Sequence, residues 1–210
     1  MSTYRRYASG STAFDTGAVN FVSPSLARTL GLTVKGQYTS YGMGEKSLTS
    51  GITTMSLVRI GRLAFRDQPF HVVPLPYALS HAFRPKIVGV IGYEILSRMP
   101  VRIDYVTQTL TFYDDPSEFA HLNRRVSIPF LLYGVTPVIH GGVDGISGLF
   151  QIDTGSDSSL TLFSPFVARH DLVNTYSPRL QGFAGEGMNG PESAYFVRAH
   201  TVQISPQIFL

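Results

Sequence analysis

The chain has 210 residues, no cysteine and a formal net charge of +3. This length allows one or two hydrophobic cores, and the lack of cysteine excludes disulfides and thiolate metal sites. The basic residues are scattered and the apolar runs are short, so neither a nucleic-acid stripe nor a membrane span is expected. Charged residues make up only 15% of the chain, while glycine, proline and aromatic residues are frequent. This balance favours short strands joined by tight turns.

The first informative stretch is Asp15-Thr16-Gly17, which directly follows the apolar residue Phe14. An apolar run that ends in Asp-Thr-Gly is typical of a buried strand that stops at a tight turn. Residues 23–31 then predict a short helix. Serine is a preferred N-cap, proline suits the first helical position, and glycine commonly follows the last turn.

Further along the chain, a glycine-dense turn at residues 42–47 predicts a hairpin. An apolar segment at residues 90–92 precedes a short helix expected near residues 93–98. A pair of strands should end near Phe112. Residues 114–118 break this pattern, so they are interpreted as a linker between two units of the chain.

The second unit is expected to begin with strands at residues 126–130 and 136–139. A glycine-rich turn at residues 141–148 follows, and a second glycine-dense hairpin is expected at residues 187–193. Few residues need be helical, so the sequence predicts an all-β chain built from two related units.

The repeat is clearest at Asp153-Thr154-Gly155, which lies 138 residues after the first Asp-Thr-Gly motif. Residues 164–169 begin with Ser-Pro and contain an Ala-Arg pair, as do residues 23–31. One Asp-Thr-Gly turn alone is a common loop. Two of them in a repeated plan suggest two carboxylates brought face to face.

These motifs resemble those of the aspartic proteases in their bacterial retropepsin-like form, where hydrophobic-Asp-Thr-Gly-(Ala/Ser) is followed by an apolar-apolar-Gly segment, here Val90-Ile91-Gly92. The resemblance implies a mainly β, bilobal acid-protease (pepsin/retropepsin-like) fold with two related β-barrel-like lobes and a few short helices. Residues 1–118 would form the first lobe and residues 119–210 the second. By comparison with the family, the first lobe would lack an N-terminal hairpin and the second would lack its C-terminal part.

The resemblance also implies the activity of an aspartic endopeptidase, in which a water molecule is activated between Asp15 and Asp153. Two carboxylates about 3 Å apart cannot both ionise comfortably, so they share a proton and titrate as a pair. The expected support of the active-site loops comes from Thr16, Gly17, Thr154 and Gly155. The expected contacts with substrate, at the hairpins called flaps, are Tyr41, Gly42, Gly44, Gly185 and Gly187.

This chemistry needs no cofactor, and none of the six histidines has metal-ligand spacing. The expected partner is an extended peptide or protein substrate, with no nucleic acid and no membrane span. Two alternatives stay open: a non-catalytic peptide-binding module on the same fold, and a homodimeric protease in which each chain supplies half. The sequence indicates no signal peptide, and the compartment, including an exported location, stays open.

Overall fold

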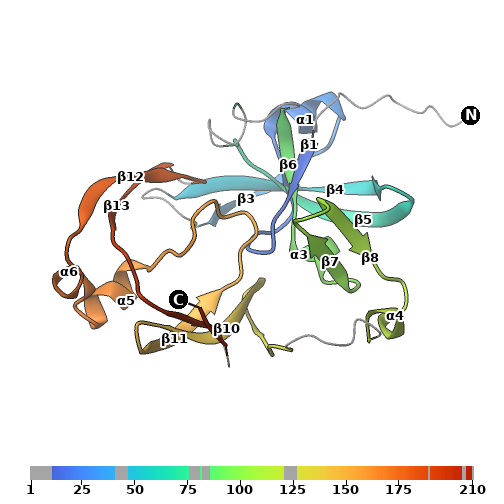
Figure 1. Cartoon of the computed structure of the whole chain (residues 1–210). Coiled ribbons are helices and arrows are strands. Elements are labelled where there is room, and N and C mark those ends of the chain that lie inside the picture. The colour runs from blue at the N-terminus through green and yellow to red at the C-terminus, as the bar shows by residue number, and fades with distance from the viewer. Residues whose placement is uncertain are drawn as a thin grey trace, which may run out of the picture.

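The computed structural model describes residues 11–40, 47–75, 81, 86–120, 127–188, 190–204 and 207–209. Of these residues, 49% lie in strands and 14% in helices, so the prediction of a mainly β chain with a few short helices is confirmed. The first half of the chain, coloured blue to green, and the second half, coloured yellow to red, occupy different parts of the molecule (Figure 1).

The first half is built on a six-stranded sheet. Its strands in spatial order are β1 (Ser11–Phe14), β6 (Ile87–Ile91), β2 (Phe21–Val22), β5 (Leu63–Val72), β4 (Leu48–Ile60) and β3 (Lys35–Ser40). Strand β1 pairs with β6 in parallel, and β2 lies between β6 and β5. This arrangement places the end of β1, where the first Asp-Thr-Gly motif begins, beside the end of β6.

Two short helices and a hairpin complete this half. They are α1 (Pro24–Thr29), α3 (Tyr93–Leu96) and the strands β7 (Val101–Asp104) and β8 (Thr109–Phe112). Both helices and the strand pair were predicted from local signals. The Ser23 hydroxyl accepts a hydrogen bond from the Leu26 N–H at 3.2 Å, which is the N-cap contact expected for α1.

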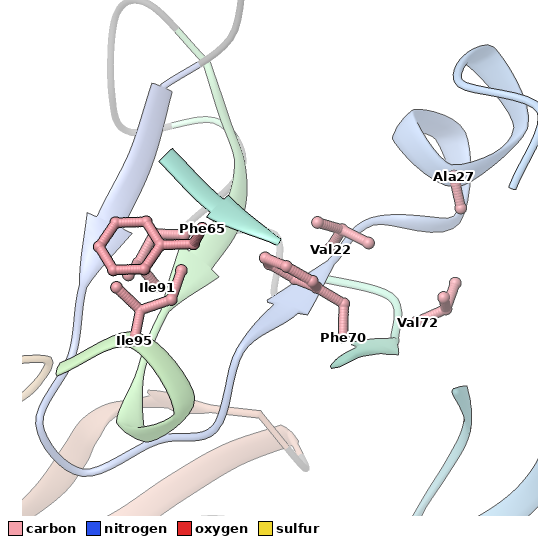
Figure 2. Close-up of a cluster of buried hydrophobic side chains, with 7 residues drawn as sticks. All are labelled: Val22, Ala27, Phe65, Phe70, Val72, Ile91 and Ile95. Carbon is pink, nitrogen blue, oxygen red and sulfur yellow. The ribbon is translucent and has the colours of Figure 1, made fainter. Parts of the chain in front are cut away.

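The core of this half consists of two clusters of buried apolar side chains. Figure 2 shows the larger one, formed by Val22, Ala27, Phe65, Phe70, Val72, Ile91 and Ile95. The smaller cluster contains Phe21, Val73 and Val90. Each fully buried side chain of the larger types contributes about 1.5–3 kcal/mol relative to an exposed one, so this core holds the ends of β1 and β6 firmly.

The second half has a five-stranded sheet and a separate hairpin. In the sheet, β11 (Ile146–Gln151), β10 (Thr136–Val143), β14 (Val202–Ile204) and β15 (Gln207–Phe209) are neighbours, and β9 (Leu131–Tyr133) also pairs with β10. The hairpin consists of β12 (Leu180–Gly187) and β13 (Gly190–Phe196). Two short helices, α5 (Ser164–Arg169) and α6 (Leu172–Thr175), precede it.

Two expectations about element boundaries in the second half are wrong. Residues 127–130 form no strand, and β9 begins only at Leu131. The preceding Pro129 has no N–H group to donate to a ladder, which explains the late start. Before this half, within the segment interpreted as a linker, helix α4 (Pro116–Ala120) begins, and the Asp115 side chain accepts a hydrogen bond from the Ser117 N–H at 2.8 Å.

The second difference concerns the glycine-rich turn expected over residues 141–148. Only Asp144 and Gly145 form the turn, with φ angles of 46° and 81°. Two residues at positive φ connect hairpin strands in the twist that the sheet requires. The flanking glycines extend the ladder instead, because Gly141 pairs with Gly148 inside strands β10 and β11.

Candidate active site

The two Asp-Thr-Gly turns follow the ends of two strands. The Asp15 N–H donates to the Ile91 carbonyl at 3.0 Å, so β6 fixes the exit from β1. The Ile152 N–H donates to the Pro137 carbonyl at 2.9 Å and fixes the exit from β11 in the same way. Each aspartate therefore begins a turn whose entry is held by a neighbouring strand.

The two turns are joined by reciprocal hydrogen bonds of their threonines. The Thr16 hydroxyl donates to the Ile152 carbonyl at 2.7 Å and accepts from the Thr154 N–H at 3.0 Å. The Thr154 hydroxyl donates to the Phe14 carbonyl at 3.2 Å and accepts from the Thr16 N–H at 3.1 Å. Each hydroxyl thus uses both its donor and its acceptor capacity on the opposite turn, which fixes the position of one turn relative to the other.

The two glycines allow the carboxylates to approach each other. The Gly17 N–H donates to Asp15 Oδ1 and the Gly155 N–H to Asp153 Oδ1, both at 2.8 Å. A Cβ atom added to Gly17 would lie 2.5 Å from the Asp153 Cγ, and one added to Gly155 would overlap the Asp15 carboxyl group. Each glycine therefore lies directly against the carboxylate of the other turn, where no side chain fits.

The environment of the two carboxylates differs. Asp15 is half-buried, whereas Asp153 is exposed. Burial raises the pKa of Asp15 to about 6, and the negative charge of Asp153 and a hydrogen bond with its side chain act in the same direction. Backbone N–H groups of Gly17 and Gly155 oppose this rise in pKa. Asp15 therefore keeps its proton at a pH where an ordinary aspartate is ionised.

The apolar segment ending at Gly92 lies behind the first turn. The Tyr93 N–H donates to the Ala18 carbonyl at 2.9 Å, and a Cβ atom on Gly92 would overlap this same carbonyl. Asn20 and Glu94 also belong to this contact, although no sequence motif singled them out. An asparagine between apolar residues, in the stretch 18–22, was the sequence signal that could have pointed to this contact.

Another residue without a sequence signal is Thr136 at the start of β10. Its hydroxyl donates to the Gly17 carbonyl at 3.2 Å and forms one more bond between the two halves of the chain. A threonine at the start of a strand is common, so its position in the sequence gives no signal. Its role comes from a contact with a residue 119 positions away.

The predicted flap residues fall in two groups. Tyr41, Gly42 and Gly44 lie outside the described residues. Gly185 and Gly187 lie in β12, so the second glycine-dense segment forms the predicted hairpin. Beyond the end of β12, Met188 packs against the smaller core cluster of the first half. The hairpin of the second half therefore reaches across to the first half.

Two further observations bear on ligands and membranes. Among the described residues, no three or more acidic or histidine side chains gather where they could hold a metal ion. In the same part of the chain, no helix has the length and apolar character needed to cross a membrane.

No model of a known protein family, no curated protein and no solved structure matches the chain. The resemblance to the aspartic proteases therefore stays a prediction from the sequence motifs.

Proposed function

We propose that the protein is an aspartic endopeptidase that hydrolyses peptide bonds with a water molecule activated between Asp15 and Asp153. The observation that carries this proposal is the reciprocal bonding of Thr16 and Thr154, which sets two hydrogen-bonded carboxyl groups against each other. A paired carboxyl and carboxylate can act as acid and base in one reaction.

In the proposed mechanism the exposed Asp153 carboxylate is the base. It takes a proton from the water molecule as the water oxygen attacks the peptide carbonyl carbon. Asp15, protonated below about pH 6, donates its proton to the carbonyl oxygen and thereby stabilises the tetrahedral intermediate. When the C–N bond breaks, Asp153 passes its proton to the leaving nitrogen and Asp15 recovers its own from the collapsing intermediate.

The substrate is proposed to bind as an extended chain beside the β12–β13 hairpin. An extended peptide can add its backbone hydrogen bonds to an exposed strand edge, while pockets for alternate side chains set preference. This mode suits a protease that cleaves unfolded segments of protein chains.

The test replaces each aspartate by its isosteric amide. Asp15→Asn and Asp153→Asn should each lower kcat on an unstructured protein substrate by roughly 10⁴-fold, because one proton-transfer group is lost while the shape is kept. Asp114→Asn, at an exposed aspartate outside the two turns, is the matched control and should keep full activity. Cleavage should be limited to acidic and near-neutral pH and be blocked by a pepstatin-type inhibitor. Retained cleavage in either active-site variant would refute the proposal.

The alternative of a non-catalytic peptide-binding module is favoured by one observation. Residues 155–159, which follow Asp153, are exposed and belong to no strand or helix. A loosely supported turn could hold the second carboxylate away from a bound peptide. In the same experiment, peptide binding without cleavage by the unmodified chain would support this alternative.

A further inference from the structure

The junction between β6 and α3 holds the first Asp-Thr-Gly turn at both of its ends. On the entry side, the Ile91 carbonyl accepts from the Asp15 N–H at 3.0 Å. On the exit side, the Ala18 carbonyl accepts from the Tyr93 N–H at 2.9 Å. Residues 91 and 93 of the junction therefore bracket the turn that carries Asp15.

The last contact of this bracket runs through Asn20, which is 0% exposed. Its N–H donates to Glu94 Oε2 at 2.7 Å, and its side-chain oxygen accepts from the Gly92 N–H at 2.8 Å. Its remaining polar groups bond to β5, with the carbonyl accepting from the His71 N–H at 2.9 Å and Nδ2 donating to the Pro69 carbonyl at 3.4 Å. Every polar group of Asn20 therefore has a partner, and Glu94 supplies the only side-chain acceptor among them.

A side-chain acceptor is needed at this position, because Asn20 is fully buried and a buried backbone N–H group without a hydrogen-bond partner is destabilising. Glu94 is half-buried, so solvent competes less for the bond than it would at an exposed site. The side chain also comes from a residue 74 positions away, so the contact ties the turn to the core and not to its own neighbours.

Within the described part of the chain, the second turn has no such bracket on its exit side. Among the described residues after Asp153, the Ser158 N–H bonds to the Ser156 hydroxyl at 3.3 Å, which is a contact within the loop itself. Beyond its entry, which the bond between Ile152 and Pro137 holds, the second turn is therefore positioned by the reciprocal threonine bonds to the first turn. The support of the first turn thus contributes to the distance between the two carboxylates.

We propose that Glu94 is a positioning residue for the candidate active site, which acts through the Asn20 N–H to hold the Asp15 carboxyl group against Asp153. The role of Glu94 in catalysis rests on the proposed function. The contact between Glu94 and the Asn20 N–H can be tested apart from catalysis, because it affects the pKa of Asp15. Among the described residues, the charge that raises the pKa of Asp15 is that of Asp153. A displaced Asp15 turn would weaken that influence.

The test follows the titration of Asp15 by carbon NMR of the labelled carboxyl group in four variants. Glu94→Ala removes the acceptor, and Glu94→Asp keeps the charge but shortens the side chain so that it cannot reach the Asn20 N–H. Glu94→Gln removes the charge but keeps an acceptor oxygen at the same length. Glu118→Ala removes an exposed glutamate from α4 and is the control for a lost surface charge.

The titration midpoint of Asp15 should fall by about one pH unit in Glu94→Ala and in Glu94→Asp. It should stay within a few tenths of a unit of the unmodified protein in Glu94→Gln and Glu118→Ala. An unchanged midpoint in Glu94→Asp would overturn the proposal. So would an equal fall in Glu94→Gln and Glu94→Ala, because the lost charge and not the lost contact would then explain both. If Glu94→Ala does not fold, the Glu94→Asp and Glu94→Gln pair decides alone.

Turnover separates this proposal from the proposed function. Glu94→Asp should lower kcat about tenfold with KM changed less than twofold, and Glu94→Gln should recover most of the loss. If the unmodified protein cleaves nothing while the titration shifts as expected, the proposed function fails and the positioning role stands. If the protein cleaves and Glu94→Asp leaves both kcat and the titration unchanged, the positioning role fails alone.

Discussion

The two Asp-Thr-Gly turns have the same internal hydrogen bonds but different surroundings. In both, the glycine N–H donates to the aspartate of its own turn, and the threonine hydroxyl bonds across to the other turn. The first turn lies on the core of the six-stranded sheet, whereas the second is followed by exposed loop residues. The comparison shows that the local geometry of a turn can be repeated while the support around it differs between the two copies.

Where the structure describes the chain, the second half also has fewer buried apolar side chains than the first half. In the described part of the second half, the buried apolar residues are Val138, Ile139, Val143 and Leu172. Large apolar side chains that stay exposed there include Leu131 at 61%, Tyr133 at 75%, Leu180 at 70% and Phe183 at 69%. The first half therefore has the larger buried core, and the second half contacts it at the turns, at Thr136 and at Met188.

The largest effect is expected from adding a side chain where the two turns lie against each other. Gly17→Ala and Gly155→Ala should each lower kcat by roughly 100-fold, because the new Cβ atom would push the opposite carboxylate away. We expect the less supported second turn to move in both variants. Steady-state kinetics on an unstructured protein substrate measures the effect. Activity within a few-fold of the unmodified protein would mean that the turns do not hold the carboxylates in contact.

A matched pair of core substitutions sharpens the comparison of the two halves. Val90→Ala, in the smaller cluster of the first half, should lower the free energy of unfolding by about 2–3 kcal/mol, from two lost methyl groups and the cavity that they leave. Val143→Ala should cost about 1–2 kcal/mol, because its surroundings can collapse more easily. Both valines are almost fully buried, at 2% and 0% exposed. Denaturant unfolding compares the two variants, and an equal or larger loss in Val143→Ala would contradict the difference in support.

Local sequence signals predicted the elements whose boundaries depend on neighbouring residues. Helix α1 follows from its serine cap and proline, and hairpin β12–β13 from its glycines. Of the strand expected over residues 126–130, the described residues 127–130 form no strand, because apolar character alone does not supply the N–H group that Pro129 lacks. The repeated Asp-Thr-Gly motif singled out the two turns because the same short pattern occurs twice.

The residues that support the turns could not be predicted in the same way. Asn20, Glu94 and Thr136 act through contacts with residues 72 to 119 positions away. No local pattern specifies such a contact, because it depends on how the sheet brings distant segments together. The difference between a half-buried Asp15 and an exposed Asp153 has the same origin.

The most direct test of the central claim is the titration of the Asp15 carboxyl group in the Asp153→Asn variant. In the unmodified protein its midpoint should lie at about 6. In the variant it should fall by about one pH unit, because the charge of Asp153 is gone, and should stay above the ordinary value of 3.8, because burial remains. The same midpoint in both proteins would contradict the account, since it would mean that the two carboxyl groups do not act on each other.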